Sequence, residues 1–253
     1  MSQRIGMCDS GIGGLLVANA LFQANPHLDI VYIGDQKNAP YGEKTREQLL
    51  SYAIALMNQF VEFNISTVII ACGTLCANVL KEIQDLYPNM NIMGILEPTC
   101  TQLKGKKVTS TLVLATQATV QRHAYQTCLN KMDSAMKVIE VACPKLVPLI
   151  EGGGEDELLQ ATAIEYVYPY IGKVDAVIMG CTHFPLVEKS VGELLNVPTF
   201  NSNVGIVTAY KSVDDQHCGK IDVYTSKDAK TMKEQIKRLI HKDWEVQEIN
   251  LDS

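Results

Sequence analysis

The sequence predicts an α/β protein with two pseudo-symmetric domains, each built on a parallel sheet, that face each other across a central cleft. Short apolar runs of strand length alternate with amphipathic segments of helix length, which is typical of parallel sheets whose strands are buried on both faces. The alternation also runs through the chain twice. The 253 residues suffice for two domains of about 120 residues each, both with a full hydrophobic core.

The individual elements follow from local patterns along the chain. Runs rich in Val, Ile and Leu have the length of buried strands. In order they are RIGMC (4–8), IVYIG (30–34), TVIIA (67–71), NIMGI (91–95), VTSTLVLA (108–115), MKVIEVA (136–142), DAVIMG (175–180) and VPTF (197–200). Apolar residues recur at helical spacing in residues 45–63, 77–86, 155–171, 186–195 and 229–241.

The repeated pattern places two cysteines at equivalent positions. STVIIACGT (66–74) and DAVIMGCTH (175–183) each have a polar start, an apolar strand, a Cys at its carboxyl end and a Thr close by. Ligands of open α/β sheets bind outside the carboxyl ends of the strands. Two such ends facing each other would therefore enclose one small pocket, with Cys72 on one wall and Cys181 on the other.

Polar, turn-rich residues between the two halves indicate where the chain changes domain. We expect the crossing in ILEPTCTQLKGKK (95–107). The first α/β domain would then hold residues 1–97 together with a C-terminal return, residues 205–253. The second would hold residues 98–204.

Composition and charge limit the kinds of partner. The formal net charge is −6 at pH 7, the pI is near 5.4 and Lys and Arg form no runs, which argues against a nucleic acid or an anionic membrane as partner. No apolar segment approaches the roughly 18 residues of a membrane helix, and the first residues lack the layout of a signal peptide. We therefore expect a cytoplasmic protein that binds a small molecule.

The eight cysteines are many for a chain of this length, and they stand singly inside or at the ends of apolar runs. In a reducing compartment this pattern favours free thiols over a disulfide framework. Most of them are expected to serve as small hydrophobic residues of the core. They are Cys8, Cys72, Cys76, Cys100, Cys128, Cys143, Cys181 and Cys218.

Four of the candidate side chains, Cys72, Cys76, Cys181 and His183, could in principle bind zinc. Structural zinc sites usually pair their ligands on tight turns. Here a helix is expected to begin after Cys72 and to turn Cys76 away from the strand end. We therefore expect no metal and interpret Cys76 as a packing residue of that helix.

The glycine loop DSGIGG after the first strand suggests anion binding, because glycines let backbone N–H groups approach a ligand at a helix N-terminus. The loop lacks the full signature of a dinucleotide site. Asp9 and Ser10 nevertheless lie where a strand turns into a helix, a suitable seat for a carboxylate or an ammonium group. The alternative is that Asp9 or Ser10 only caps the helix.

Two opposed thiols suit the inversion of a carbon that bears a hydrogen. One group removes the proton from one face and the other returns a proton to the opposite face. One cysteine must then be a thiolate while the other is a thiol, which partly exposed positions near helix N-termini favour. Asp9 near the first thiol, and Glu151 or His183 near the second, could relay the protons, although His183 could also be a buried structural histidine. Such proton transfer needs no cofactor.

Six motifs resemble those of the glutamate racemase family, within the aspartate/glutamate racemase superfamily, in order and approximate spacing. They are MCDSGIGG, YIGDQKNAPYG, IIACGT, LATQATV, CPKLVPLIE and MGCTHFPL, and the similarity spans roughly residues 5–207. The resemblance implies a cofactor-independent two-base racemase of two pseudo-symmetric α/β domains, usually a homodimer. Its implied reaction interconverts L- and D-glutamate and supplies D-glutamate for peptidoglycan.

The resemblance also implies roles for individual residues. Cys72 and Cys181 match the two acid/base residues, and Asp9, Glu151 and His183 match the residues that assist them. The implied substrate-binding residues are Ser10, Pro40, Tyr41, Gly42, Gly73, Thr74, Thr116, Thr119 and Thr182.

One departure from the family pattern falls inside the expected site. The family has Ala-Cys-Asn-Thr where this chain has Ala-Cys-Gly-Thr at 71–74, and Gly73 lacks the amide that ordinarily holds the substrate. Farther on, Asn201 replaces a common Asp, and Ala115-Thr116 replaces a usual Gly-Thr. The thiol pair is intact, and because the other motifs match the glutamate pattern closely, we expect glutamate as the substrate and a gain in glutamate efficiency from Gly73→Asn. The alternatives are racemisation of a different small acid or amino acid, and a homologue that binds without turnover.

Overall fold

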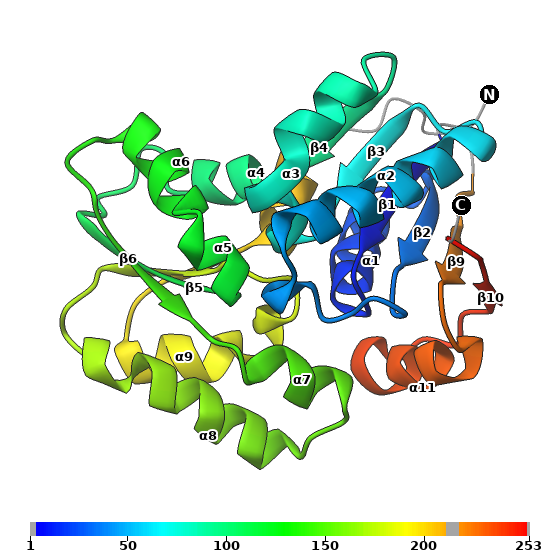
Figure 1. Ribbon diagram of the computed structural model, residues 1–253. Coiled ribbons are helices and arrows are strands. Elements are labelled where there is room, and N and C mark those ends of the chain that lie inside the picture. Colours follow the sequence, from blue (N-terminus) through cyan, green and yellow to red (C-terminus); the bar gives the residue numbers. More distant parts are fainter. Residues whose placement is uncertain (1–3, 211–217, 252–253) are drawn as a thin grey trace.

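Two parallel sheets form the centre of the protein (Figure 1). The computed structural model describes residues 4–210 and 218–251. One sheet has the strand order β10-β9-β2-β1-β3-β4 and the other the order β6-β5-β7-β8, and neighbouring strands are parallel throughout. We call the larger sheet with its helices the first lobe, and the smaller sheet with its helices the second lobe. The predicted fold class is confirmed.

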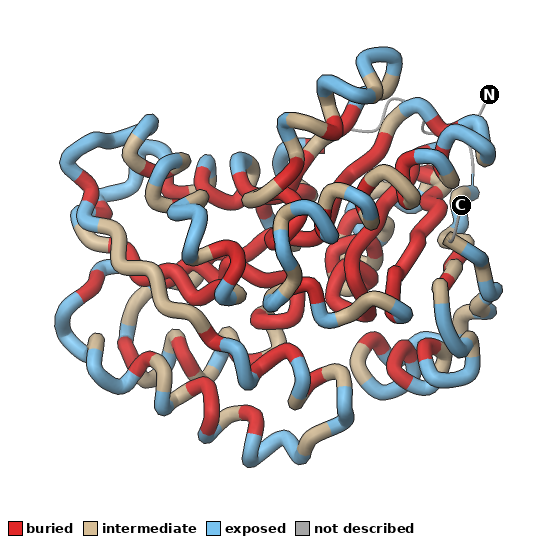
Figure 2. The backbone as a smooth tube through the Cα atoms, in the orientation of Figure 1, coloured by how far each residue is buried: buried red, intermediate tan, exposed pale blue. Residues whose placement is uncertain are grey.

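The larger sheet is formed mainly by buried aliphatic strands. Its members are β1 (Arg4–Asp9), β2 (Asp29–Gly34), β3 (Thr67–Ile70), β4 (Asn91–Gly94), β9 (Ile221–Thr225) and β10 (Val246–Glu248). The strands β1, β2 and β3 are buried after their first residue, as expected of parallel strands with helices on both faces (Figure 2). The strands β9 and β10, which the apolar patterns did not predict, extend this sheet beyond β2.

The smaller sheet repeats this arrangement with fewer strands. Its members are β5 (Ser110–Ala115), β6 (Lys137–Ala142), β7 (Ala176–Met179) and β8 (Thr199–Asn201). All four coincide with predicted runs. The strand β6 lies at an edge and is only half-buried, whereas β7 is buried at every position.

Helices connect the strands and flank both sheets. In chain order they are α1 (Gly13–Ala24), the 3₁₀ turn η1 (Tyr41–Glu43), α2 (Arg46–Glu62), α3 (Gly73–Leu86), α4 (Leu96–Thr101), α5 (Gln117–Gln121), α6 (Ala124–Met132), α7 (Leu146–Glu151), α8 (Asp156–Val167), η2 (Tyr168–Tyr170), η3 (Phe184–Val187), α9 (Glu188–Leu195), α10 (Ser202–Ala209) and α11 (Ala229–Ile240).

Several helix limits differ from the sequence predictions for physical reasons. The helix expected over 77–86 begins four residues earlier, because Cys72 occupies its N-cap position directly after β3. The helix expected over 155–171 gives way to the 3₁₀ turn η2 after Val167, where Pro169 lacks the N–H that an α-helix needs. The predicted crossing at 95–107 is not entirely turn-like, since it contains α4.

The chain passes between the lobes twice. It enters the second lobe through α4 and returns through α10, and these two helices pack against each other. The helix α10 also packs against α1 of the first lobe. The exact domain limits given above stay a prediction.

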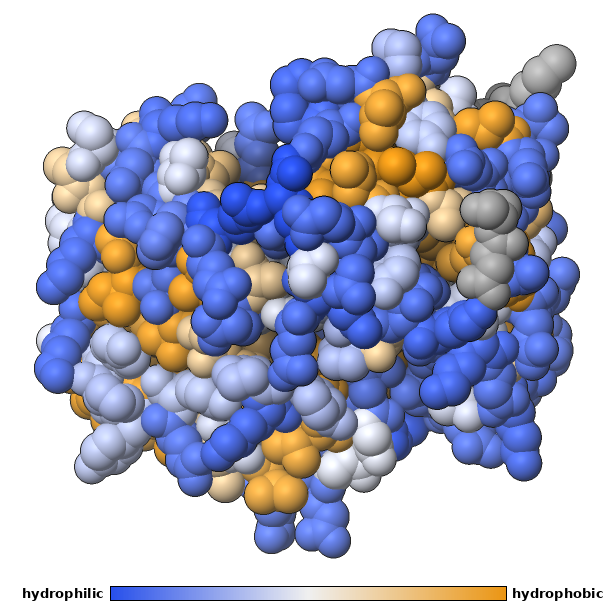
Figure 3. All heavy atoms as spheres, in the orientation of Figure 1, coloured by the Kyte–Doolittle hydropathy of each residue, from blue (hydrophilic) through white to orange (hydrophobic). Residues whose placement is uncertain are grey.

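Apolar side chains are buried in two clusters. The larger fills the first lobe and continues into the second through residues such as Tyr125 and Ile178, and the smaller lies among β7, α7, α8 and α9. Hydrophilic residues cover most of the face in Figure 3, and hydrophobic ones gather in patches, one of them over α2 and α3. Among the described residues, no helix has the length and apolar character needed to cross a membrane.

Candidate active site

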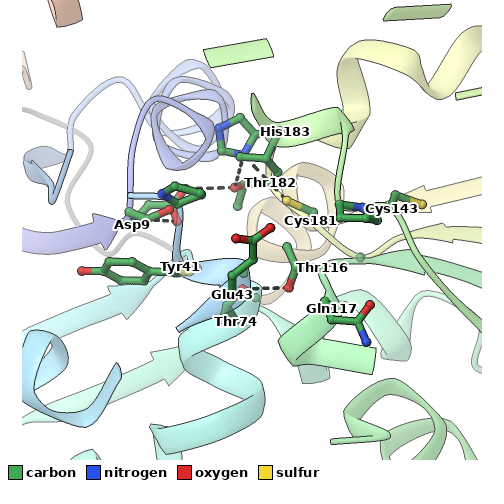
Figure 4. A pocket seen from close by; sticks show the side chains of 18 of the residues that line it. Asp9, Tyr41, Glu43, Thr74, Thr116, Gln117, Cys143, Cys181, Thr182 and His183 are labelled. Carbon is green, nitrogen blue, oxygen red and sulfur yellow. Dashed lines mark hydrogen bonds between the residues drawn. The ribbon is translucent and has the colours of Figure 1, made fainter. Parts of the chain in front are cut away.

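A pocket lies between the two lobes, where carboxyl ends of strands from both sheets face each other. Its lining residues are Asp9, Ser10, Pro40, Tyr41, Gly42, Glu43, Cys72, Gly73, Thr74, Thr116, Gln117, Cys143, Pro144, Val147, Pro148, Gly180, Cys181, Thr182 and His183 (Figure 4). The volume open to the centres of water molecules is about 40 Å³, room for about three waters. The pocket is therefore suited to a small ligand.

Most of the predicted site residues line this one pocket. The exceptions are Glu151 and Thr119. Glu151 contacts His183, and the hydroxyl of Thr119 lies 2.9 Å from that of Thr116, so both lie directly behind lining residues.

Cys72 lies on the wall formed by the first lobe. It follows β3, occupies the N-cap position of α3 and is 4% exposed. Burial, together with the charge of Asp9, raises the pKa of the Cys72 thiol well above its ordinary value. Both effects favour the neutral thiol over the thiolate.

Asp9 ends β1 and is also buried. Its Oδ1 accepts from the backbone N–H of Ser10 at 2.8 Å, and its Oδ2 accepts from the Thr182 hydroxyl of the opposite wall at 2.9 Å. Burial raises the pKa of Asp9 in spite of these bonds and of the nearby His183. Neither Asp9 nor Ser10 caps α1, whose N-cap residue is Ile12 and has no side-chain cap. The alternative of a purely capping role is therefore wrong.

Cys181 lies on the wall formed by the second lobe, just beyond the end of β7. Its Sγ lies 3.7 Å from Nδ1 of His183, and Nε2 of that ring lies 2.8 Å from Oε1 of Glu151. Because Glu151 Oε1 also accepts from the Ile12 backbone N–H at 3.1 Å, the carboxylate is held from the first lobe as well. A Cys–His–Glu row thus leads from the pocket into the interior.

The charges of this row support one another. Burial alone would lower the pKa of His183, but its hydrogen bonds to Cys181 and Glu151 outweigh burial and raise the pKa well above its ordinary value. Burial alone would raise the pKa of Glu151, but the hydrogen bond and charge of His183 outweigh it and lower the pKa. His183 is therefore joined through both ring nitrogens to ionisable neighbours in the site, and its role in proton transfer stays a prediction.

Bare backbone lets the two walls approach closely. The glycine loop after β1 packs against the other wall, so that a Cβ at Gly13 would lie 2.5 Å from Nδ1 of His183. Likewise, a Cβ at Gly73 would lie 2.9 Å from the backbone oxygen of Gly180. Neither position has room for a side chain while the walls stand in this arrangement.

Hydroxyl groups close the remaining side of the pocket. The hydroxyls of Thr74 and Thr116 lie 2.9 Å apart and join the two walls (Figure 4). The buried ring of Tyr41 is fixed by its hydroxyl, which donates to Asp35 at 2.5 Å. No Lys or Arg is found among the described residues that line the pocket.

Cys76 does not belong to the pocket. Its Sγ donates to the Ile70 backbone oxygen at 3.2 Å inside the first lobe, as expected of a packing residue. All eight cysteines are free thiols. Residues 4–210 and 218–251 contain no group of three or more His, Cys, Asp and Glu side chains arranged to hold a metal ion.

Sequence reasoning missed several lining residues. They are Glu43, Gln117, Cys143, Pro144, Val147, Pro148 and Gly180. The motif CPKLVPLIE begins at Cys143, so its apolar and proline positions were a usable signal for this part of the wall. Glu43 and Gln117 follow Gly42 and Thr116 directly and had no signal of their own.

A model of the Asp/Glu/hydantoin racemase family matches residues 16–210. The chain belongs to this family. The glutamate racemase of Aquifex aeolicus (strain VF5) is 31% identical over 246 residues, which cover 96% of this chain and 96% of that protein. Among solved structures, glutamate racemase isoform RacE1 from Bacillus anthracis superposes with a TM-score of 0.91 at 26% identity and covers 98% of both chains.

A second solved member of the racemase family contains a ligand. It is glutamate racemase from Thermus thermophilus in complex with β-chloro-D-alanine, with a TM-score of 0.87, 25% identity and coverage of 99% of this chain and 98% of that chain. The family resemblance of the sequence motifs is therefore confirmed, and the chain is a homologue of racemases, which are isomerases.

Proposed function

We propose that the protein is an amino-acid racemase that interconverts L- and D-glutamate, with Cys72 and Cys181 as its two acid/base groups. The observation that carries the proposal is the position of the thiols, on opposite walls of one pocket, each beside a group that can exchange a proton with it. Cys72 lies close enough to Asp9 for the charge of that carboxylate to raise the pKa of the thiol, and Sγ of Cys181 lies 3.7 Å from Nδ1 of His183. A pocket used for binding alone has no need of two such pairs.

In the proposed reaction one proton is removed from Cα and a different proton is added to the opposite face of the same carbon. In one direction the Cys181 thiolate takes the Cα proton, and the Cys72 thiol gives its own proton to the opposite face of the carbanion. The raised pKa of Cys72 supports its role as donor in this direction. The enzyme is left with a Cys181 thiol and a Cys72 thiolate, which is the starting state for the opposite enantiomer. Asp9 and His183 can restore the first state by moving protons.

Neutral donors would hold the carboxylates of the substrate, since no lining residue described here is Lys or Arg. The hydroxyls of Ser10, Thr74 and Thr182 reach the pocket, and α3 begins at its wall with unpaired backbone N–H groups. Such donors form charge-assisted hydrogen bonds with a carboxylate.

Glutamate is proposed because the relatives described above are named glutamate racemases. The ligand of the Thermus thermophilus protein, β-chloro-D-alanine, also supports an amino acid as the ligand of this pocket. A different small acid or amino acid is the outcome to expect if Gly73 has adapted the pocket to another side chain.

The proposal extends to the cellular setting. The motif resemblance supports a cytoplasmic homodimer that works without added cofactor and supplies D-glutamate for peptidoglycan. Light scattering on the eluting protein would measure the oligomeric state, and rescue of a D-glutamate auxotroph would test the biosynthetic role.

Exchange of the α-hydrogen with solvent tests the reaction itself. Purified, dialysed protein is incubated in deuterated buffer with single L- and D-amino acids, and deuterium at Cα is followed by NMR. We expect exchange and racemisation of glutamate without added metal or pyridoxal phosphate. Absence of exchange with every amino acid would favour a binding homologue, and exchange that requires a cofactor would exclude the two-thiol mechanism.

Replacement of each thiol tests the roles of the cysteines. We expect Cys72→Ser and Cys181→Ser each to reduce racemisation by at least about a hundredfold, because a hydroxyl is a much weaker acid than a thiol. Cys76→Ser is the matched control, since Cys76 lies on the same helix outside the pocket. Circular dichroism checks folding. Near-normal turnover in either active-site variant would disprove the two-base assignment.

A further inference from the structure

A buried glutamine of the first lobe reaches the Cys–His–Glu row of the second. The helix α11 lies beside α7, the helix that carries Glu151 (Figure 1). Gln235 of α11 is 7% exposed, and its Nε2 donates to the backbone oxygen and to Oε2 of Glu151, both at 3.0 Å. The two oxygens of the Glu151 carboxylate are thus divided between Gln235 and His183.

The orientation of the Gln235 amide is fixed by its other neighbours. Its Oε1 accepts from Nε2 of Gln36 at 2.6 Å, and Oε1 of Gln36 accepts from the Thr225 hydroxyl at 3.0 Å. Since the backbone oxygen and the ionised carboxylate of Glu151 can only accept, the N–H group of Gln235 must face them, and the Gln36 amide and the Thr225 hydroxyl are oriented in turn. The row of donors therefore runs in one direction, from β9 to Glu151.

We propose that Gln235 is a positioning residue of the racemase, which holds the Glu151 carboxylate ionised and oriented so that His183 can exchange a proton with Cys181. The proposal rests on the proposed function and adds to it a residue from outside the pocket. Glu151 Oε1 accepts from Nε2 of His183, so Nδ1 faces the pocket, where it lies 3.7 Å from Sγ of Cys181 and 3.5 Å from the Thr182 hydroxyl and can exchange a proton with the thiol.

The surroundings of the row contain few other ionisable groups. Those facing it are Asp9 and Tyr32 from the first lobe, Cys143 from the second, which lies near Cys181, and Arg238 from α11. Arg238 donates from Nη2 to the Ile150 backbone oxygen at 2.8 Å, so it also joins α11 to α7 but has no hydrogen bond to the Glu151 carboxylate. Gln235 is thus the α11 side chain that touches the carboxylate in the described structure.

Loss of Gln235 should narrow the pH range of activity. Without the donor the Glu151 carboxylate is less stable, so its pKa rises and the acid limb of the kcat profile moves to higher pH. The carboxylate is also no longer held in place beside the ring, so its hydrogen bond to His183 becomes poorer, the imidazolium is stabilised less and the alkaline limb moves to lower pH. A lost hydrogen bond to a charged group corresponds to a shift of about one pH unit and to about a tenfold loss of kcat.

The experiment compares Gln235→Leu, Gln36→Leu and the control Arg238→Met with the wild type. We expect the pH profile of kcat to be narrowed in Gln235→Leu and to keep its width in Arg238→Met. Gln36→Leu should narrow it less, because Gln36 only orients the Gln235 amide. The α-deuterium isotope effect should rise for one enantiomer only, the one that Cys181 deprotonates. The kcat/KM values cannot reveal this asymmetry, because their ratio is fixed by the equilibrium between enantiomers.

A second readout does not depend on turnover. The pKa of His183 is followed by NMR of ¹⁵N-labelled imidazole, and we expect it to fall by about one unit in Gln235→Leu. If the wild type racemises nothing, the proposed function fails and this titration still decides the role of Gln235. If the titration and the profile are unchanged in both glutamine variants, or if Arg238→Met narrows the profile equally, the proposal is overturned. If Gln235→Leu does not fold, Gln36→Leu carries the test.

Discussion

Gly73 adjoins Cys72 and faces the backbone of the opposite wall, where a Cβ would lie 2.9 Å from the Gly180 oxygen. A backbone oxygen at the end of a buried strand has little freedom to move aside. Any side chain at this position therefore has to push the two lobes apart. The absence of an amide at Gly73 is thus linked to how closely the walls stand, which the sequence alone did not reveal.

This contact reverses the effect expected from restoring the asparagine. We now expect Gly73→Asn and Gly73→Ala to lower kcat/KM about ten- to a hundredfold, since overpacking of a tight contact costs about 1–3 kcal/mol. Gly192→Ala is the control, because Gly192 lies in α9 outside the pocket and its Cβ would lie 3.1 Å from Cγ2 of Thr199, a methyl group at the end of a side chain, so its loss should be much smaller. Steady-state kinetics with glutamate measure the effect. A higher kcat/KM in Gly73→Asn than in the wild type would contradict this expectation and show that the two pocket walls can move apart to accept the side chain.

Single residues also show where sequence reasoning stops. Cys72, Cys181 and His183 could be placed in one pocket, because strand ends and repeated motifs mark them. The contact between Gln235 and Glu151 could not be predicted, since it joins residues 84 positions apart and a lone glutamine in an amphipathic helix has no distinguishing signal. The roles assigned to the site residues stay predictions until variants are measured.

At the scale of elements, the strands were easier to predict than the helix limits. Buried parallel strands leave continuous apolar runs, so β1 to β8 were all found. The short helices α5, α7 and α10 have five to eight residues, too few for a helical period to stand out. The strand β9 was missed because its sequence, IDVYT, mixes polar and apolar residues without a buried run.

The start of α2 allows a test at this scale. The Thr45 side chain accepts from the Gln48 backbone N–H at 3.3 Å, and the Gln48 side chain accepts from the Thr45 backbone N–H at 3.0 Å, which together form a capping box. We expect Thr45→Ala to lower the free energy of unfolding by about 1 kcal/mol. Thr45→Ser keeps the hydroxyl and should lose much less. Urea titrations measure both, and equal stability of the three proteins would contradict the role of the cap.

At the scale of the whole molecule, the His183–Glu151 pair of the Cys–His–Glu row makes the stability of the fold depend on pH. The raised pKa of His183 means that its stabilising effect is fully present below the ordinary histidine pKa of about 6.5 and is lost as pH rises through the folded-state pKa. The lowered pKa of Glu151 means that its effect is present above the ordinary glutamate pKa and is lost as pH falls through the folded-state value. The pair therefore stabilises the folded protein most at pH values between the ordinary pKa of glutamate and the ordinary pKa of histidine.

Replacement of the histidine should remove this dependence. We expect His183→Gln to be destabilised relative to the wild type most strongly in mildly acidic buffer, between the two ordinary pKa values, and less so in alkaline buffer. Urea unfolding at a series of pH values measures the difference. A difference that stays constant with pH would mean that the ring contributes through packing and not through its charge.

The return of the chain to the first lobe has a consequence for biosynthesis. The strand β2 acquires its outer neighbour only when β9 has been made, after the whole second lobe. On the ribosome, a nascent chain that already carries both thiols still has an open sheet edge, a known starting point for aggregation. Gln235 emerges later still. The last helix thus covers the sheet and supplies the side chain that contacts Glu151, so a chain that ends before α11 would be prone to self-association and would lack this contact.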